Sequence, residues 1–121
     1  MAIILLVEDD TSMRHFLSNA LERAGHELTL CADGLEALAH LKENKDKKYD
    51  LLLTDIVMPG MDGIKLSQKA AELDPQLKVM FMTGFSAVVM NRKDMAKEAP
   101  VMSKPFHLKD LVSQVEELLA A

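Results

Sequence analysis

The chain contains 121 residues, of which 49% are hydrophobic and 27% are charged, and its formal net charge is −5. A chain of this length forms one domain, which we expect to span residues 1–121. The acidic balance argues against nucleic-acid binding, because phosphate recognition needs a clustered basic surface. The apolar stretch at residues 1–7 meets three acidic residues at once and is too short to cross a membrane. We therefore expect a globular domain that binds neither nucleic acid nor a membrane.

Five short apolar segments predict β-strands. In chain order they are Ile3–Val7, Glu27–Cys31, Asp50–Thr54, Leu77–Met82 and Val101–Ser103. Helical patterns lie between them, and this alternation predicts a parallel sheet with right-handed crossovers and helices on both faces. In such sheets the ligand site lies at the carboxyl ends of the strands. Cys31 ends the second predicted strand, where a buried, inert thiol is expected, and a single cysteine is typical of the reducing cytoplasm.

The helical stretches show recognisable ends. In the first, apolar residues recur on one face until Gly25 ends the helix: Met13, Phe16, Leu17, Ala20, Leu21 and Ala24. Asp33 followed by Glu36 predicts a capping box at the start of the second helix. The third begins after Asp62 and ends before Pro75, and its apolar stripe consists of Leu66, Ala70 and Leu73. The last helix has a regular stripe: Leu108, Leu111, Val112, Val115, Leu118 and Leu119.

Residues 86–99 predict a fourth helix that packs weakly, because three consecutive apolar residues are followed by mostly polar ones. Its Met90 and Met95 are candidate docking residues, since methionine adapts to irregular surfaces. Met80 and Met82, in the preceding strand, are expected to fill the core instead. The histidines show no metal-ligand spacing, and solvated or core-edge positions are expected for all four: His15, His26, His40 and His107.

Polar groups gather at the predicted strand ends. Glu8, Asp9 and Asp10 follow the first strand, and Asp55 follows the third. In a parallel sheet these carboxylates meet at one edge, where they repel one another unless a cation is present. Mg²⁺ suits such an edge, because it binds through one or two carboxylates, a carbonyl and water. For Asp10 we favour a helix N-cap over a metal ligand.

Two further strand ends complete this edge. Thr83 ends the fourth strand and Lys104 follows the fifth. An ionised Asp55 beside Mg²⁺ can act as a nucleophile toward phosphorus and form an acyl phosphate. The hydroxyl of Thr83 and the ammonium of Lys104 would then supply the donor and the cation that a phosphorylated aspartate requires.

The elements "EDD", "TDIVMPGMDG", "TG" and "KPF", in this order and spacing, resemble the CheY-like receiver domain of bacterial two-component response regulators, and the resemblance covers the whole chain. It implies a flavodoxin-like (βα)5 fold, with a doubly wound parallel five-stranded sheet in the order 2-1-3-4-5. It also implies that Asp55 is the phosphoacceptor and that Glu8 and Asp9 serve Mg²⁺ with it. The backbone carbonyl of Val57 would complete the metal shell, and a histidine kinase or histidine phosphotransfer protein would donate the phosphoryl group.

By the same resemblance, Thr83 would be the switch hydroxyl, Lys104 would contact the phosphoryl group, and Pro105 would follow a cis peptide bond. Receivers usually carry a switching aromatic near the position of Val101, and this chain has none there. Phe85, two residues after Thr83, is the alternative candidate for the output switch.

The residue two positions after Asp55 bears on turnover. Phosphatases with an aspartyl nucleophile usually carry a second aspartate there, and this chain has Val57, so we expect no enzyme activity. In receivers this position and that of Phe85 influence how water reaches the acyl phosphate. Both are apolar here, which predicts slow self-dephosphorylation.

The chain ends with the last helix at Ala121, so we expect a monomeric, stand-alone receiver that acts by binding partners. The stretches "LLVEDDTSMRHFL", "FMTGF" and "SKPFHL" resemble in particular receivers associated with adaptor control of the ClpXP protease, which makes ClpX, ClpXP or its substrates candidate partners. The alternative is a phosphoryl shuttle without separate output. The terminal Leu-Ala-Ala resembles a ClpX recognition tail, but the fraying end of an alanine-rich helix is the favoured explanation.

Overall fold

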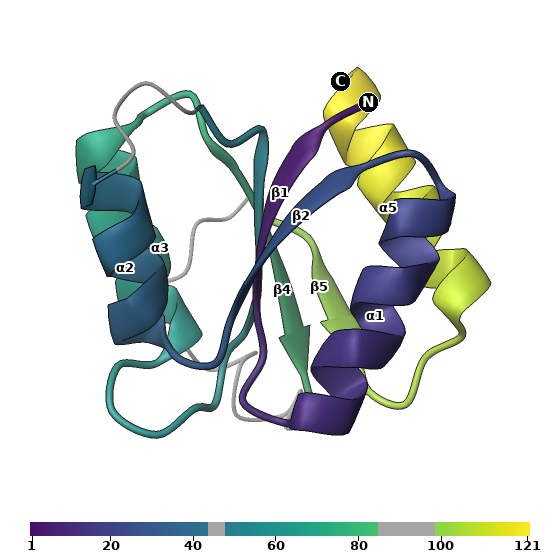
Figure 1. Cartoon of the computed structure of the whole chain (residues 1–121), viewed down its shortest axis with the longest axis horizontal. Helices are drawn as coiled ribbons and strands as arrows, with labels where there is room; N and C mark the ends of the chain where they lie inside the picture. Colours follow the sequence, from purple (N-terminus) through teal and green to yellow (C-terminus); the bar gives the residue numbers. More distant parts are fainter. Residues whose placement is uncertain (44–47, 85–98) are drawn as a thin grey trace.

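The computed structural model describes residues 1–43, 48–84 and 99–121. Five parallel strands form one sheet in the order β2-β1-β3-β4-β5 (Figure 1). Their bounds are β1 (Ile3–Val7), β2 (Glu27–Cys31), β3 (Leu51–Asp55), β4 (Lys78–Thr83) and β5 (Val101–Ser103). The predicted fold class and strand order are therefore confirmed. The fourth helix predicted over residues 86–99, together with Phe85, Met90 and Met95, lies outside the described residues apart from Ala99.

Strands β3 and β4 each begin and end one residue later than predicted. Asp50 does not begin the strand. Its N–H donates to the Ile3 carbonyl at 2.7 Å, while its carboxylate accepts the Ile3 N–H at 2.7 Å. At the other end, parallel pairing continues through Asp55 opposite Met82. Asp55 is thus the last paired residue of a strand, and the rigid sheet holds its backbone.

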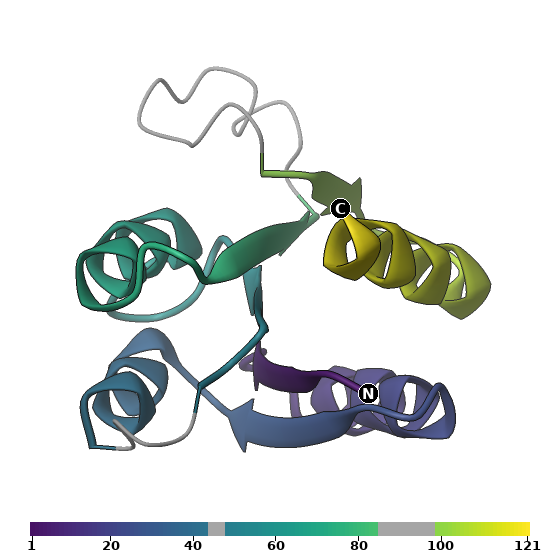
Figure 2. The same cartoon turned by 90° about the horizontal axis from the view of Figure 1, so that it is seen from above.

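Helices cover both faces of the sheet, as predicted. α1 (Thr11–Arg23) and α5 (Leu108–Ala120) pack on one face, and α2 (Gly34–Glu43) and α3 (Gly63–Leu73) on the other (Figure 2). The sheet residues alternate between the two sides: Ile4 and Leu6 contact the α1 and α5 cluster, whereas Leu5 and Val7 contact the α2 and α3 cluster. Burial on both faces explains the continuous apolar strands.

Three residues of the predicted apolar stripes are not core residues. Phe16 is 57% exposed, Leu73 is 46% exposed, and Ala24 at the end of α1 is also exposed. The buried face of α1 centres on Leu17 and Leu21, and Phe16 lies about 100° away from Leu17 around the helix. The apolar period thus indicates a face but not where its edge lies. Met80 and Met82 are fully buried, which confirms their predicted core role.

Helix ends follow the predicted caps. Asp10 and Asp62 are N-caps whose carboxylates accept from Met13 N at 2.9 Å and Lys65 N at 2.8 Å. Asp10 is therefore a cap, as favoured. α1 ends before Gly25, whose φ of 98° is a left-handed conformation that suits glycine. These caps fix where each helix leaves the sheet and hence the position of the strand-end residues.

Candidate functional site

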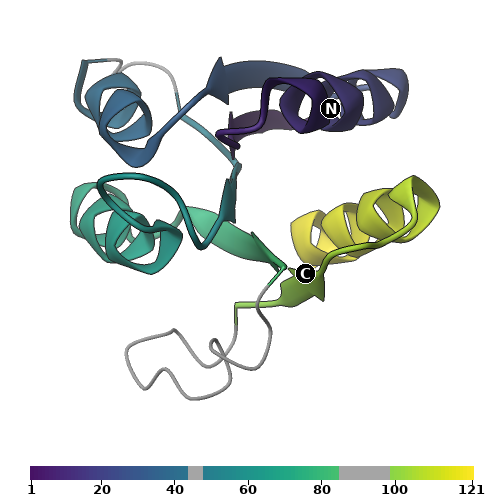
Figure 3. The same ribbon diagram turned by 90° about the horizontal axis from the view of Figure 1, so that it is seen from below.

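The carboxyl edge of the sheet, seen from below in Figure 3, brings the predicted site residues together. Glu8 follows β1, Asp55 and Thr83 end β3 and β4, and Lys104 follows β5. Glu8 and Thr83 are fully buried and Asp55 is 7% exposed. Buried carboxylates are rare unless they are paired, so the partners of this group decide what it can do.

Lys104 joins the two buried carboxylates. Its Nζ donates to Glu8 Oε1 at 2.6 Å and to Asp55 Oδ2 at 2.9 Å. Burial lowers the pKa of Lys104, but the hydrogen bonds and charges of Glu8 and Asp55 outweigh burial, so the pKa lies above its ordinary value. The lysine therefore stays charged and holds one oxygen of Asp55 in place.

Asp9 adds a third carboxylate. Ligand oxygens of Glu8, Asp9 and Asp55 all lie within 4.8 Å of one another. Partial desolvation, and then the hydrogen bond with Glu8, raise the pKa of Asp9 above its ordinary value of 3.8, while the charge of Lys104 lowers it. Three acidic groups thus face one ammonium, and like charges remain in excess.

This donor set fits a small, hard dication. Mg²⁺ binds oxygen ligands, usually keeps several waters, and takes one or two carboxylates from the protein. Receiver domains bind Mg²⁺ in general at an acidic pocket of this kind. Val57, whose carbonyl was predicted to join the metal shell, lies two residues after the end of β3, and the residue is 49% exposed. Its metal contact stays a prediction.

Lys104 also connects the site to the strands beside it. Its backbone N–H donates to the Thr83 carbonyl at 2.7 Å, next to the pairing of Thr83 with Ser103. The peptide bond between Lys104 and Pro105 is cis, as expected. A displacement of Lys104 would therefore act directly on the ends of β4 and β5.

Three supporting residues were not predicted. A Cβ on Gly63 would lie 2.2 Å from the Asp55 carbonyl oxygen, so only glycine fits this close approach. The Thr54 hydroxyl donates to the same carbonyl at 2.9 Å. Arg14 Nη1 donates to the Glu8 carbonyl at 2.8 Å. The "DG" pair at residues 62–63 could have indicated Gly63, whereas the other two contacts have no local sequence signal.

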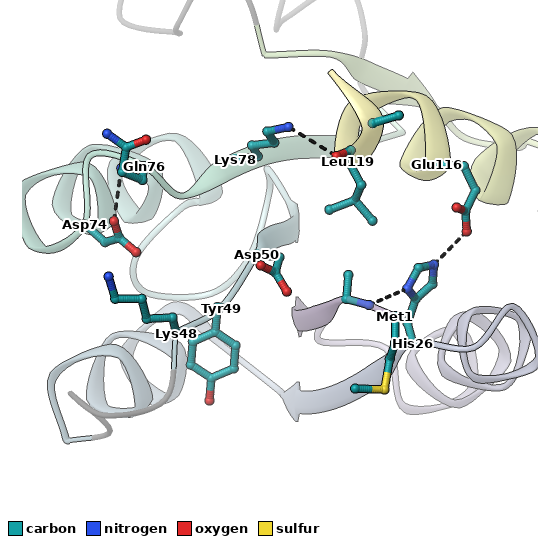
Figure 4. A pocket seen from close by; sticks show the side chains of 12 residues that line it. Met1, His26, Lys48, Tyr49, Asp50, Asp74, Gln76, Lys78, Glu116 and Leu119 are labelled. Atoms are coloured by element: carbon teal, nitrogen blue, oxygen red, sulfur yellow. Dashed lines mark hydrogen bonds and ion pairs between the residues drawn. The ribbon is translucent and has the colours of Figure 1, made fainter.

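A cavity of about 510 Å³ lies at the opposite, amino edge of the sheet (Figure 4). Several of its polar lining residues bond to one another or to the backbone. His26 Nδ1 accepts the Ala2 N–H at 3.1 Å, and its Nε2 lies 2.7 Å from Glu116 Oε1. Lys78 Nζ donates to the carbonyls of Leu118 and Ala121 at 2.8 and 2.6 Å. We therefore assign the chemistry to the carboxyl edge and a structural role to this cavity's lining.

Comparison with known proteins gives a consistent result. Residues 4–116 match the family model described as "Response regulator receiver domain". The chain is 53% identical over 119 residues to "Response regulator receiver protein CpdR" of Brucella abortus (strain 2308), and the match covers 98% of this chain and 97% of that protein.

Solved structures show the same architecture. The receiver domain of the hybrid histidine kinase CckA has a TM-score of 0.82 at 33% identity, covering 97% of this chain and 98% of that one. The response regulator TrrA of Thermotoga maritima, solved in complex with Mg(2+)-BeF, has a TM-score of 0.81 at 27% identity, covering 98% of this chain and 99% of that one. Among the described residues, no helix combines the length and apolar character needed to span a membrane.

Proposed function

The chain belongs to the response regulator receiver domain family, and from this premise we propose that it accepts a phosphoryl group on Asp55 and thereby switches its binding to a protein partner. One observation carries the proposal. Asp55 is held 2.9 Å from the Lys104 ammonium and shares a cluster of carboxylate oxygens with Glu8 and Asp9. A nucleophile, a fixed cation and a dication-binding donor set thus meet at one strand end.

Glu8, Asp9 and Asp55 are the residues that would hold Mg²⁺, with the Val57 carbonyl as a further ligand. When bound, Mg²⁺ neutralises charge on the phosphoryl oxygens. The chain's own contribution is positional. The Thr54 hydroxyl and the close approach of Gly63 fix the Asp55 carbonyl, and Lys104 fixes its carboxylate. A nucleophile held in this way needs little rearrangement before attack.

In the proposed transfer, an oxygen of Asp55 forms a bond to the phosphorus of a phosphohistidine. The bond between phosphorus and the histidine nitrogen breaks, and that nitrogen takes up a proton. The donor is a histidine kinase or a histidine phosphotransfer protein. Because the chain itself is modified and releases no product, it acts as the acceptor in the phosphotransfer and not as an enzyme.

The new phosphoryl charge competes for Lys104. Before transfer the ammonium bridges Glu8 and Asp55. After transfer it would contact the phosphoryl oxygens, with the Thr83 hydroxyl as a second donor. Because the Lys104 N–H bonds the Thr83 carbonyl at 2.7 Å, both responses would move the adjoining ends of β4 and β5. A partner would sense this change at the neighbouring surface.

For the partner we propose ClpX, the ClpXP protease or one of its substrates. Two observations support this choice: the resemblance of several stretches to receivers associated with adaptor control of ClpXP, and the identity of 53% to CpdR, the receiver type to which that resemblance points, over nearly the full length of both chains. The second candidate is a phosphoryl shuttle without separate output. The similarity to the receiver of the hybrid histidine kinase CckA favours it, since that receiver lies within a kinase.

Binding of purified ClpX in the presence and absence of beryllofluoride, a mimic of the acyl phosphate, separates the two functions. We expect ClpX or ClpX–substrate binding to change about tenfold or more between the two states, which corresponds to about 1.4 kcal/mol. Asp55→Asn should abolish that difference. Equal binding in both states, with phosphotransfer intact, would favour the shuttle.

A further inference from the structure

A second group of potential metal ligands lies at the junction of β2 and α2. The Cys31 thiol, a Glu36 carboxylate oxygen and a His40 ring nitrogen lie within 4.8 Å of one another. Cys31 ends β2, while Glu36 and His40 are one helical turn apart on α2. Spacing in the sequence does not reveal this group, because one ligand comes from the strand and two from the helix.

The local structure places the Cys31 and Glu36 side chains beside each other. Cys31 is 1% exposed and packs between the sheet and α2, so its sulfur has a defined position. The Glu36 N–H donates to Asp33 Oδ1 at 2.8 Å, and Glu36 Oε2 accepts the Ala32 N–H at 3.1 Å. This capping arrangement holds the Glu36 side chain over the end of β2.

The ligand types select the metal. Zn²⁺ binds Cys sulfur, His nitrogen and carboxylate oxygen at about 2.0–2.3 Å, which places tetrahedral ligands roughly 3.5 Å apart. Separations below 4.8 Å therefore close with small movements of Glu36 and His40. Mg²⁺ prefers oxygen ligands only, so it would select the Glu8–Asp9–Asp55 cluster instead.

The surroundings favour a cation. Burial, and then the negative charges of Glu36 and Asp33, together raise the pKa of the Cys31 thiol to about 12, while the charge of Arg14 opposes them. The free thiol is therefore protonated and unreactive. The same negative charges attract a metal ion, and coordination would displace the thiol proton.

We propose that Cys31, Glu36 and His40 form a binding site for Zn²⁺ or a similar thiophilic dication, with water as the fourth ligand. The ion ties α2 to the end of β2. Because the Glu8 N–H donates to the Cys31 carbonyl at 3.1 Å, this site adjoins the phosphoacceptor edge of the sheet without sharing a ligand with it.

Titration of the full chain with Co²⁺ tests the site, in excess Mg²⁺ so that the acidic cluster is already supplied. Thiolate coordination to Co²⁺ gives a near-ultraviolet charge-transfer absorption that an all-oxygen site cannot give. We expect one equivalent of Co²⁺ to develop this band and Zn²⁺ to remove it. Cys31→Ser should abolish the band, and Glu36→Gln and His40→Gln should each weaken binding about tenfold or more.

His107→Gln is the matched control, because this histidine is exposed and makes no side-chain cap bond. It should bind Co²⁺ as the unaltered chain does. Zn²⁺ should also raise the melting temperature of the unaltered chain and not that of His40→Gln. Absence of the band, or a band of undiminished affinity in both helix variants, would overturn the proposal. Co²⁺ binding that lacks the band and that Asp9→Asn abolishes would place the metal at the acidic cluster and would also overturn it.

Discussion

The two edges of the sheet use similar charged side chains in opposite ways. At the amino edge, Lys78 bonds the last carbonyls of α5, and His26 joins the first strand to Glu116. These side chains complete backbone or side-chain hydrogen bonds. At the carboxyl edge, Lys104 bridges two buried carboxylates that lie beside a third. The first arrangement is balanced in itself, whereas the second leaves negative charge that an external cation can satisfy.

This difference indicates that the amino edge contributes mainly to stability and the carboxyl edge mainly to function. Paired groups at the amino edge stabilise the fold and offer little to a ligand. Crowded carboxylates at the carboxyl edge destabilise the isolated protein and provide the site. Substitutions at the two edges should therefore have separable effects on unfolding and on phosphorylation.

The largest effect on stability is expected for Gly63→Ala. Its Cβ would lie 2.2 Å from the Asp55 carbonyl oxygen, so the backbone of β3 or α3 has to move. We expect the free energy of unfolding in urea to fall by about 3 kcal/mol, together with slower phosphorylation of Asp55. Gly84→Ala, at the same edge but with no atom of the described residues within 4 Å of its Cβ, is the control. Equal stability of the two variants would contradict the close approach.

The next effect is expected for His26→Ala, at the amino edge. The substitution leaves the buried Ala2 N–H without its acceptor, which costs about 1–3 kcal/mol. Chemical denaturation measures this loss, and His107→Ala should change the free energy of unfolding by less than about 0.5 kcal/mol. Mg²⁺-dependent phosphorylation of folded His26→Ala should stay unchanged, and a marked loss there would show that the two edges are coupled.

A smaller effect is expected for Lys78→Met. The lysine donates to the Leu118 and Ala121 carbonyls at the negative end of the α5 dipole, an interaction worth about 0.3–1 kcal/mol. Amide hydrogen exchange in the last turn of α5 should become faster. Lys109→Met, in the first turn of the same helix, should leave that exchange as it was. Unchanged exchange in Lys78→Met would mean that packing alone holds the helix end.

The smallest effect on stability is expected for Asp9→Asn without Mg²⁺. Whether this substitution raises or lowers the stability tests the repulsion between the carboxylates. The folded-state pKa of Asp9 is raised, so folding favours its protonated form. The contribution of this carboxyl to the free energy of unfolding therefore falls as the pH rises from 3.8 through the folded-state pKa. Above that range Asp9→Asn should be the more stable chain. Added Mg²⁺ should reverse the order by stabilising the unaltered chain more. Thermal melts at several pH values check both signs, and greater stability of the unaltered chain without Mg²⁺ would contradict the repulsion.

Sequence patterns predict the sheet well, because the central strands, buried on both faces, are continuous apolar runs, and β1, β3, β4 and β5 end at or are directly followed by a polar residue. That logic places Asp55, Thr83 and Lys104 at one edge before any coordinates are known. The same patterns do not show that Phe16 lies outside the core, since periodicity gives a face and not its width. Contacts between distant backbone atoms, such as that of Gly63 with Asp55, leave no periodic signal.

The site residues themselves are predictable, but their partners are less so. Nothing in the segment around Glu8 indicates that it is fully buried against Lys104, because the pairing spans 96 residues of sequence. His40 shows the same limit. Its nearness to Cys31 depends on how α2 packs on β2, and spacing along the chain had argued against any metal role for the histidines.

The most direct test of phosphate acceptance at the carboxyl edge is the intact mass after incubation with acetyl phosphate, with and without Mg²⁺. The measurement compares the unaltered chain with the Asp55→Asn and His26→Ala variants. We expect a gain of about 80 Da, one phosphoryl group, only with Mg²⁺ and only in the unaltered chain and His26→Ala. An equal gain in Asp55→Asn, or no gain in any chain even with a phosphohistidine donor, would contradict the assignment of Asp55 as the phosphoacceptor.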